Sequence, residues 1–368
     1  MTTLTTRLPG RAGRTLAFAR RHSAVVMFAA GFLFDFLTIQ RIDAWTDLAI
    51  QLLYLSGLTI LLFLQHREAH GLWRAPESLA RWWNYNVEVL HFLYGGLLSA
   101  YVVLYFKSST GARPLVFFVL LVGLMFLNEM PQVRRLGHRW RLGLYAFCVI
   151  SFLNYFVPIL VGRMGGWVFT LALVLSAAFV WTVADRLAAP DPDRAKTRLR
   201  LFAPAAAVCL TIAVLYALRL IPPVPLSVQF HGIYHDVRRQ DGSYVLTYEK
   251  PPLRFFWRTE SRPFRRRAGD RVHYFVRVFA PARFRHQVFT RWEVQGPDGT
   301  WRTSDRIPLE IVGGRAEGFR AWAVKSNFTA GDWRVTAETD DGRAIAMLRF
   351  TVTEEMGDDE RDWATVEG

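Results

Sequence analysis

The sequence predicts an α-helical transmembrane bundle of about seven spans, followed by an all-β, immunoglobulin-like sandwich domain. Three observations predict it: seven apolar runs before residue 222, arginines that gather at alternate ends of those runs, and short alternating segments after it. The 368 residues are 52% hydrophobic and 21% charged, which excludes a disordered chain. Two cysteines exclude a disulfide scaffold.

The apolar runs account for the bundle. They lie at residues 23–40, 45–65, 87–106, 115–128, 142–160, 165–184 and 201–221. A helix of about 20 apolar residues crosses a hydrocarbon core of roughly 30 Å. Buried helices of a soluble protein are the alternative, but seven such runs in one half of the chain favour membrane spans. The first run lacks a convincing signal-peptide cleavage site, so we expect a retained helix.

The positive charge indicates the orientation. Of the formal net charge of +14, +12 lies before residue 222. With the N-terminus inside, 17 Lys and Arg residues fall in the inner segments and 5 in the outer ones. Cytoplasmic loops carry this excess, so we expect a cytoplasmic N-terminus and an exterior C-terminal domain. The excess of positive charge is then explained by the orientation of the chain in the membrane. We therefore expect no nucleic-acid partner.

The chain after residue 221 predicts strands. Arg271–Phe279, His286–Gln295 and Ala344–Val352 alternate apolar and polar residues, and Gly-containing turns separate such segments. We expect domain boundaries at 1–221 for the transmembrane part, 222–353 for the β-sandwich and 354–368 for a disordered acidic tail.

Two groups of residues carry a family resemblance. The β-domain holds Phe328-Thr-Ala-Gly-Asp-Trp-Arg-Val335, Asp341-Gly-Arg343 and Leu348-Arg-Phe-Thr-Val352, and the membrane half holds Gly31-Phe-Leu-Phe-Asp35, Arg41-Ile-Asp43 and Asn128-Glu129. Together they resemble the bacterial multi-pass membrane proteins that end in the domain of unknown function 2914. The resemblance implies an inner (plasma) membrane protein with a periplasmic β-domain, and it supplies no catalytic residues.

Ionisable residues inside spans are candidates for a functional site, because burying them in lipid is costly. The candidate intramembrane polar site comprises Asp35, Arg41, Glu88, His91 and Glu129. Asp35 has two interpretations, a proton or polar pathway and a structural ion pair with Arg41 or Lys107. Glu88 and His91 share a helix face at i,i+3 spacing, but a carboxylate-bridged metal site needs a second copy of that motif. We therefore expect no metal and no cofactor, with interfacial polar residues as the simpler interpretation.

A second candidate site lies in the exterior domain. Arg254, Arg258, Arg265, Arg266 and Arg267 alternate with aromatic residues soon after the last span. Anionic lipid headgroups are the ligand that this pattern favours there, and a solvated strand face or loop is the alternative. The acidic tail could fold back onto these arginines.

No P-loop, dinucleotide fingerprint or nucleophile elbow is present in the sequence. The leading hypothesis is a non-enzymatic envelope protein that presents a periplasmic binding module. Its partners would be the lipid bilayer and an anionic lipid headgroup, an envelope protein or a glycan. The alternative is a membrane-embedded transporter or enzyme that uses the intramembrane acidic and histidine residues. The sequence makes no prediction of oligomeric state.

Overall fold

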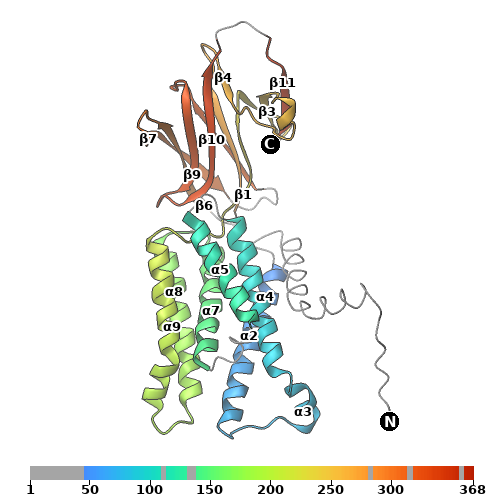
Figure 1. Ribbon diagram of the computed structural model, residues 1–368, viewed down its shortest axis with the longest axis vertical. Helices are drawn as coiled ribbons and strands as arrows, with labels where there is room; N and C mark the ends of the chain where they lie inside the picture. Colours follow the sequence, from blue (N-terminus) through green and yellow to red (C-terminus); the bar gives the residue numbers. More distant parts are fainter. Residues whose placement is uncertain (1–44, 109–112, 131–137, 281–284, 313–317, 356–359) are drawn as a thin grey trace, which may run out of the picture.

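The computed structural model describes residues 45–108, 113–130, 138–280, 285–312, 318–355 and 360–368. A bundle of helices lies at one end of the molecule and a β-rich region at the other (Figure 1). The chain passes from one to the other once, through the segment that follows the last helix. The apolar run expected at 23–40 lies outside the described residues.

Six of the expected spans coincide with helices. The helices are α2 (Trp45–Ala69), α3 (Glu77–Trp83), α4 (Asn86–Lys107), α5 (Arg113–Glu129), α7 (His138–Val161), α8 (Gly166–Ala188) and α9 (Arg194–Ala217). Within the described residues, five of them are long and apolar enough to cross a membrane: α2, α4, α7, α8 and α9. The apolar part of α5, Leu115–Asn128, is shorter. The short helix α3 was not predicted, since its seven residues are too few for a periodic pattern.

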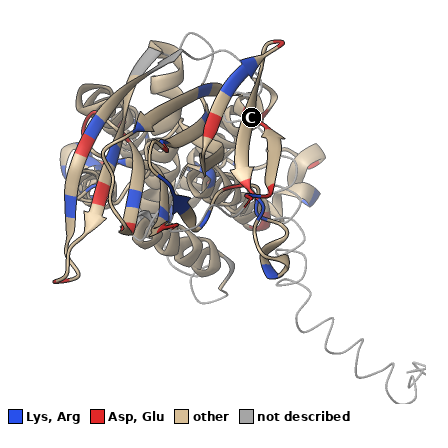
Figure 2. Cartoon of the chain, turned by 90° about the horizontal axis from the view of Figure 1, so that it is seen from above, with Lys and Arg blue, Asp and Glu red and all other residues tan. Residues whose placement is uncertain are grey.

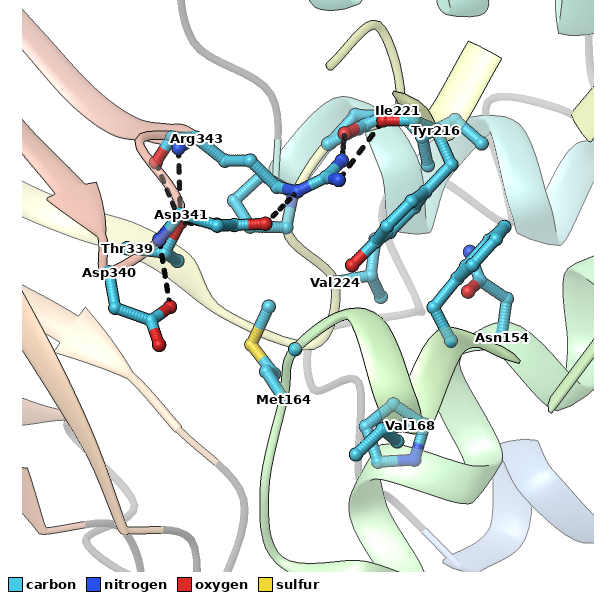
Figure 3. Close-up of a pocket in the computed structure, with 15 residues that line it drawn as sticks. Asn154, Met164, Val168, Tyr216, Ile221, Val224, Thr339, Asp340, Asp341 and Arg343 are labelled. Atoms are coloured by element: carbon cyan, nitrogen blue, oxygen red, sulfur yellow. Dashed lines mark hydrogen bonds and ion pairs between the residues drawn. The ribbon is translucent and has the colours of Figure 1, made fainter. Parts of the chain in front are cut away.

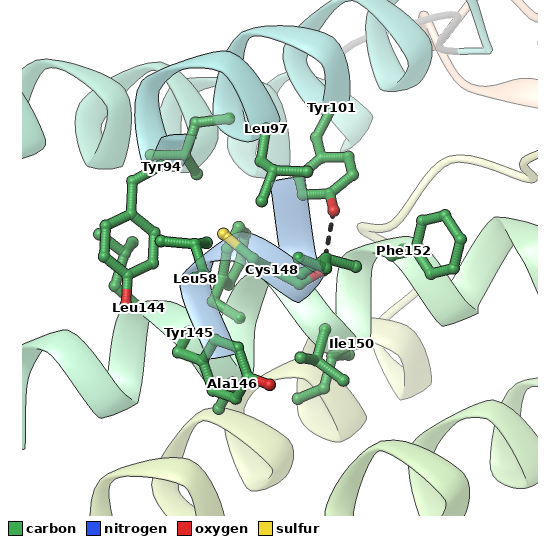
Figure 4. Close-up of a cluster of buried hydrophobic side chains, with 14 of the residues drawn as sticks. Leu58, Tyr94, Leu97, Tyr101, Leu144, Tyr145, Ala146, Cys148, Ile150 and Phe152 are labelled. Carbon is green, nitrogen blue, oxygen red and sulfur yellow. Dashed lines mark hydrogen bonds between the residues drawn. The ribbon is translucent and has the colours of Figure 1, made fainter. Parts of the chain in front are cut away.

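Helices α4 and α7 form the centre of the bundle. Tyr94, Leu97, Tyr101 and Cys148 from these helices are fully buried, and Tyr101 donates a hydrogen bond of 3.0 Å to the carbonyl of Cys148 (Figure 4). A buried tyrosine hydroxyl needs such a partner, because an unpaired polar group in an apolar interior is costly.

The outer surface of the bundle is apolar. Leu53 on α2, Phe92 on α4 and Leu210 on α9 are 69%, 66% and 67% exposed. A water-soluble protein rarely exposes a large contiguous apolar surface. These faces, together with the five apolar helices, suggest membrane association.

Three sheets make up the β-rich region. The first has the order β1 (Ser227–Tyr234), β5 (Val272–Phe279), β8 (Phe319–Lys325). The second has the order β4 (Phe264–Arg266), β10 (Ala344–Glu354), β9 (Gly331–Thr339), β6 (Arg285–Gln295), β7 (Trp301–Val312). The third has the order β11 (Trp363–Glu367), β3 (Ser243–Glu249), β2 (Asp236–Gln240), and a 3₁₀ turn, η1 (Leu253–Phe255), follows β3 in sequence. The three strands expected from alternation are confirmed as β5, β6 and β10.

The first two sheets share one hydrophobic core. Tyr274 and Val276 from β5 pack in the same cluster as Trp292 from β6 and Val335 from β9. Alternate residues of these strands are therefore buried, and the other face of the five-stranded sheet carries charged residues. The finer immunoglobulin-like assignment stays a prediction.

The C-terminus differs from the expected disordered tail. Residues Trp363–Glu367 form β11, which pairs with the edge of β3. Arg361 ties this strand to the sandwich through Asp270 at 3.0 Å and Glu355 at 2.8 Å. Backbone pairing along the open edge of β3 and these ion pairs give the segment an ordered position that its acidic composition does not indicate.

Two glycines test the packing of the bundle. A Cβ added at Gly96 on α4 would lie 2.6 Å from the ring of Tyr54 on α2, whereas one added at Gly123 on α5 would meet nothing within 4 Å. Overpacking costs about 1–3 kcal/mol, so Gly96→Ala should lower the thermal unfolding temperature of the detergent-purified protein. Gly123→Ala is the matched control and should leave it unchanged or raise it. Equal effects of the two substitutions would contradict this packing of α2 on α4.

Candidate functional site

Of the five residues in the predicted intramembrane site, the structure describes the side chains of Glu88 and His91. Asp35 and Arg41 lie outside the described residues. Glu88 is exposed on α4, while His91, one turn later, is buried. Glu129 ends α5, and its side chain is not described. In the described part of the chain, no group of three or more His, Cys, Asp or Glu side chains could hold a metal ion.

His91 pairs with Asn128 of α5. The His91 Nδ1 lies 3.0 Å from Asn128 Oδ1, and Asn128 Nδ2 donates to the His91 carbonyl at 3.2 Å. This reciprocal pair joins two helices inside the bundle, as polar side chains commonly do in membranes. The histidine therefore has a structural role here.

Other polar groups of the bundle are also paired across helices. Tyr155 donates to Gln51, and Asn154 Nδ2 donates to the Tyr105 hydroxyl at 2.9 Å. The hydroxyls of Thr59 and Tyr145 lie 2.6 Å apart. Such pairs hold the helices together and satisfy groups that lipid cannot solvate.

The five arginines of the predicted headgroup site divide into two sets. Arg265 pairs with Glu249, Arg266 with Glu354 at 3.5 Å, and Arg267 with Glu355 at 2.8 Å. Although burial opposes it, hydrogen bonds from Arg267 and Arg361 hold the pKa of Glu355 below its usual range. Acidic residues at the start of the expected tail thus neutralise this set.

The second set surrounds η1. Among the described residues neither of its arginines forms an ion pair, although the charge of Arg258 acts on Glu260. The guanidinium groups of Arg254 and Arg258 lie 4.8 Å and 4.1 Å from the ring centre of Phe255. Their neighbours Leu253 and Phe256 are 91% and 77% exposed. The structure therefore places these two arginines in an aromatic, solvent-exposed turn.

Arg343, in the turn between β9 and β10, holds the β-rich region on the bundle. Its Nη1 donates to the Ile221 carbonyl at 3.2 Å, its Nη2 to the Tyr216 carbonyl at 3.1 Å, and its Nε to Asp341 at 2.7 Å (Figure 3). The guanidinium also lies 3.5 Å from the centre of the Tyr216 ring. One buried side chain therefore fixes the end of α9 against the second sheet.

A small cavity adjoins this contact. It has a volume of about 30 Å³ and is lined by Asn154, Val168 and Tyr216 from the bundle and by Thr339 and Asp341 from the β-rich region (Figure 3). A cavity of that size admits a water molecule or two, and no larger ligand.

A much larger cavity opens on the other side of Arg343, and we call it the junction cavity. Its volume is about 900 Å³. Six arginines line it: Arg219, Arg262, Arg291, Arg334, Arg343 and Arg349. The remaining polar side chains of its lining are His231, Glu260, Thr336 and Glu338. Arg219 follows α9, so one wall belongs to the bundle end and the other to the second sheet.

Basic and acidic residues follow one another along neighbouring strands of the second sheet (Figure 2). Glu293 of β6 accepts two hydrogen bonds from Arg334, at 2.8 and 2.7 Å. Glu338 of β9 accepts from Arg291 at 2.9 Å and from Arg306 at 3.0 Å. Each glutamate is 3% exposed, and its charge is compensated by these arginines.

Two further groups of the lining, His231 on β1 and Glu260 before β4, have shifted pKa values. Burial raises the pKa of Glu260 despite the neighbouring Arg262. Burial and Arg262 lower the pKa of His231. Glu260 Oε2 and His231 Nδ1 are buried without a hydrogen-bond partner among the described residues. This part of the lining is polar, and Arg262 lies 3.4 Å from the other carboxylate oxygen of Glu260.

Sequence analysis missed the residues of the junction cavity. The available signal was the i,i+2 spacing of polar residues in two strands, Arg291 and Glu293 in one and Arg334 with Thr336 and Glu338 in the other, with Met347 and Arg349 at the same spacing in a third. That spacing puts each set on one strand face. Only the pairing register, which a single sequence does not provide, brings the three sets together.

Comparison with protein families adds one finding. Residues 285–352 match the family model "Protein of unknown function (DUF2914)". The DUF2914 segment runs from β6 to β10 and contains four of the six cavity arginines, Arg291, Arg334, Arg343 and Arg349.

The other comparisons give little more. No relative is found among curated proteins. Among solved structures, one match is the Pseudomonas fluorescens alkylpurine DNA glycosylase AlkC bound to DNA containing an abasic site analog. It is 11% identical, covers 83% of this chain and 98% of that chain, and has a TM-score of 0.21. This TM-score lies far below that of a shared fold, so the likeness supports no conclusion.

The contact of Arg343 makes a first prediction for the junction. In Arg343→Lys, a single ammonium group cannot reach the two carbonyls and the carboxylate that the guanidinium binds together. Each buried group that loses its partner costs about 1–3 kcal/mol. Hydrogen–deuterium exchange of the full-length protein should therefore accelerate in residues 218–226. Arg349→Lys, an exposed position on β10, should leave exchange there unchanged. Unaltered exchange in Arg343→Lys would show that the contact does not hold the junction.

His235 makes a second prediction, on pH. Burial and the nearby Arg361 lower the pKa of His235 from 6.5 to about 4. Between these values the unfolded chain binds more protons than the folded one, so stability falls as pH falls from about 6.5 to about 4. Burial also lowers the pKa of His273, which adds a contribution of the same sign. His235→Gln should flatten the pH dependence of urea unfolding, followed by tryptophan fluorescence, and an unchanged slope would contradict the assignment.

Proposed function

We propose that the protein is a non-enzymatic, integral inner-membrane protein that holds a β-rich binding module at the outer surface of a bacterial inner membrane. In this proposal the module is periplasmic and binds an anionic ligand in the junction cavity. The observation that carries the proposal is the cavity itself, about 900 Å³ with six arginines in its lining. Ligand sites are commonly clefts of roughly 300–1,000 Å³ between structural units.

The charge at the two ends of the bundle supports this orientation. Basic residues near the end away from the β-rich region are Arg67, Arg74, Arg81, Arg141, Arg186, Arg194, Lys196, Arg198 and Arg200. Near the other end they are Lys107, Arg163 and Arg219. The positive-inside rule then favours a cytoplasmic position for the first end and a periplasmic position for the β-rich region.

The cavity supports binding in preference to catalysis or transport. Its arginines and glutamates are permanent or compensated charges, suited to recognising an anion. Several polar groups buried in the bundle form individual cross-helix pairs, such as His91 with Asn128 and Asn154 with Tyr105. We therefore place the ligand at the membrane surface, outside the bundle.

Cysteine labelling tests the orientation. On a Cys209→Ser background, Thr303→Cys on exposed β7 should react with a membrane-impermeant maleimide in intact bacterial spheroplasts. Lys196→Cys, exposed at the start of α9, should react only after permeabilisation. Both positions are exposed, so access to the reagent decides the result. The opposite labelling pattern would overturn the periplasmic assignment.

Thermal unfolding tests the cavity as the binding site. We expect at least one anion among inorganic phosphate, citrate and dextran sulfate to stabilise the full-length, delipidated protein in dodecyl maltoside. A ligand at ten times its Kd stabilises by about 1.4 kcal/mol, and added salt should reduce the effect. Met347→Trp places a large ring in the cavity lining and should abolish the stabilisation. Thr303→Trp, on an exposed strand position, is the control. No stabilisation by any of the anions, or equal stabilisation in Met347→Trp, would refute the proposal.

A further inference from the structure

The second sheet brings four arginines into two neighbouring rows. In one row, Arg349 of β10 lies opposite Arg334 of β9, which lies opposite Glu293 of β6. In the next row, Thr336 of β9 lies opposite Arg291, which lies opposite Arg306 of β7. Like charges directly opposite each other destabilise a sheet unless an anion lies between them.

Within the part of the chain that the structure describes, carboxylates compensate only one of these two like-charge pairs. Glu338 lies between Arg291 and Arg306 and binds both, at 2.9 and 3.0 Å. Glu293 binds Arg334 at 2.7 Å and Arg291 at 3.4 Å, but it does not reach Arg349. Among the described residues, no carboxylate forms an ion pair with Arg349. The contact found for its guanidinium is with the ring of Trp301, whose centre is 5.5 Å away.

Arg219 adds a further cation from the bundle side. It lines the same cavity and forms no ion pair with a described carboxylate, and its charge acts on Asp341, which Arg343 already pairs. Its guanidinium lies close to Gly342, since a Cβ there would be 3.2 Å from Arg219 Nη1. The junction therefore keeps this charge at the turn between β9 and β10, beside the sheet that carries Arg349.

A buried hydroxyl points to a ligand at this place. Thr336 is 1% exposed and lines the cavity, and its Oγ1 has no hydrogen-bond partner among the described residues. A buried hydroxyl without a partner costs about 1–3 kcal/mol. Thr336 stands next to Arg334 and Arg349 on the sheet, so an oxyanion held by these arginines would also accept a hydrogen bond from it.

We infer that Arg334, Arg349, Thr336 and Arg219 form a subsite for a phosphoryl group. This inference rests on the proposed function and names the chemical class of its ligand. A planar carboxylate matches one guanidinium, whereas the tetrahedral oxygens of a phosphoryl group accept from donors on several elements at once. The cavity is far larger than one phosphate, so the group belongs to a larger molecule whose remaining part would face His231 and Glu260. The phosphoryl group could be carried by a lipid headgroup or by a soluble phosphate ester.

Binding to the full-length, delipidated protein in dodecyl maltoside tests the subsite. The probes are inorganic phosphate, glycerol 3-phosphate, micelles doped with phosphatidylglycerol, and citrate as a non-phosphate anion. We expect one or more phosphate-bearing probes to bind in isothermal titration, and Arg349→Gln to weaken that binding tenfold or more. Thr336→Val, which removes the hydroxyl and keeps the shape, should weaken it about threefold to tenfold. Arg302→Gln, an exposed arginine paired with Asp298 on the same sheet, should bind as the unaltered protein does.

The outcomes distinguish the phosphoryl subsite from the more general anion-binding function. They also distinguish the two sources of the phosphoryl group. Binding of glycerol 3-phosphate supports a soluble phosphate ester, and binding of the doped micelles alone supports a lipid headgroup. Citrate binding without phosphate binding would overturn the phosphoryl subsite and leave the anion-binding function in place. Binding of no anion would overturn both. Equal loss in Arg302→Gln and Arg349→Gln would also overturn the subsite, because it would show a general effect of surface charge.

Discussion

The contact of Arg343 with the end of α9 is the interaction on which the rest of the architecture depends. Its guanidinium uses three donor atoms on two carbonyls and a carboxylate, and its face lies on the Tyr216 ring. A single covalent linker between the bundle and the β-rich region would leave their relative position variable. The buried guanidinium of Arg343 restricts them to one relative position, because the N–H groups of a planar guanidinium point in fixed directions.

The fixed junction gives the large cavity its two walls. One wall is the charged outer face of the second sheet, and the other is formed by the chain that leaves α9, with Arg219. Charged faces of sheets are usually solvated, so arginines there contribute little to stability or binding. Here the chain that leaves α9 brings Arg219 to the cavity beside that face, and the added positive charge strengthens the attraction for an anion. The buried Glu293 and Glu338 compensate part of the positive charge, and the surplus near Arg349 and Arg219 makes the site selective for an oxyanion.

Much of the architecture could be predicted from the sequence, because the patterns that indicate helices and strands lie within short stretches of the chain. Apolar runs predicted six of the described helices, and strict alternation predicted β5, β6 and β10. The C-terminal strand β11 did not follow, because its order comes from pairing with β3 and from the ion pair of Arg361 with Asp270. Both β3 and Asp270 lie far from β11 in the sequence. The candidate site did not follow either. Glu88 and His91 share a spacing but not an environment, since one is exposed and the other bonds to Asn128. Arg334 and Arg349 meet only through the register of β9 with β10.

A distance measurement across the junction tests the central claim most directly, namely that the bundle and the β-rich region share one fixed geometry that forms the cavity. Spin labels at Arg163→Cys, exposed between α7 and α8, and at Thr303→Cys, exposed on β7, would report it by double electron–electron resonance on a Cys209→Ala background. The account predicts one narrow distance population centred on the separation in the structure. A broad or multiple distribution would contradict it, because a cavity with one moving wall could not hold Arg219 and Arg349 around the same ligand.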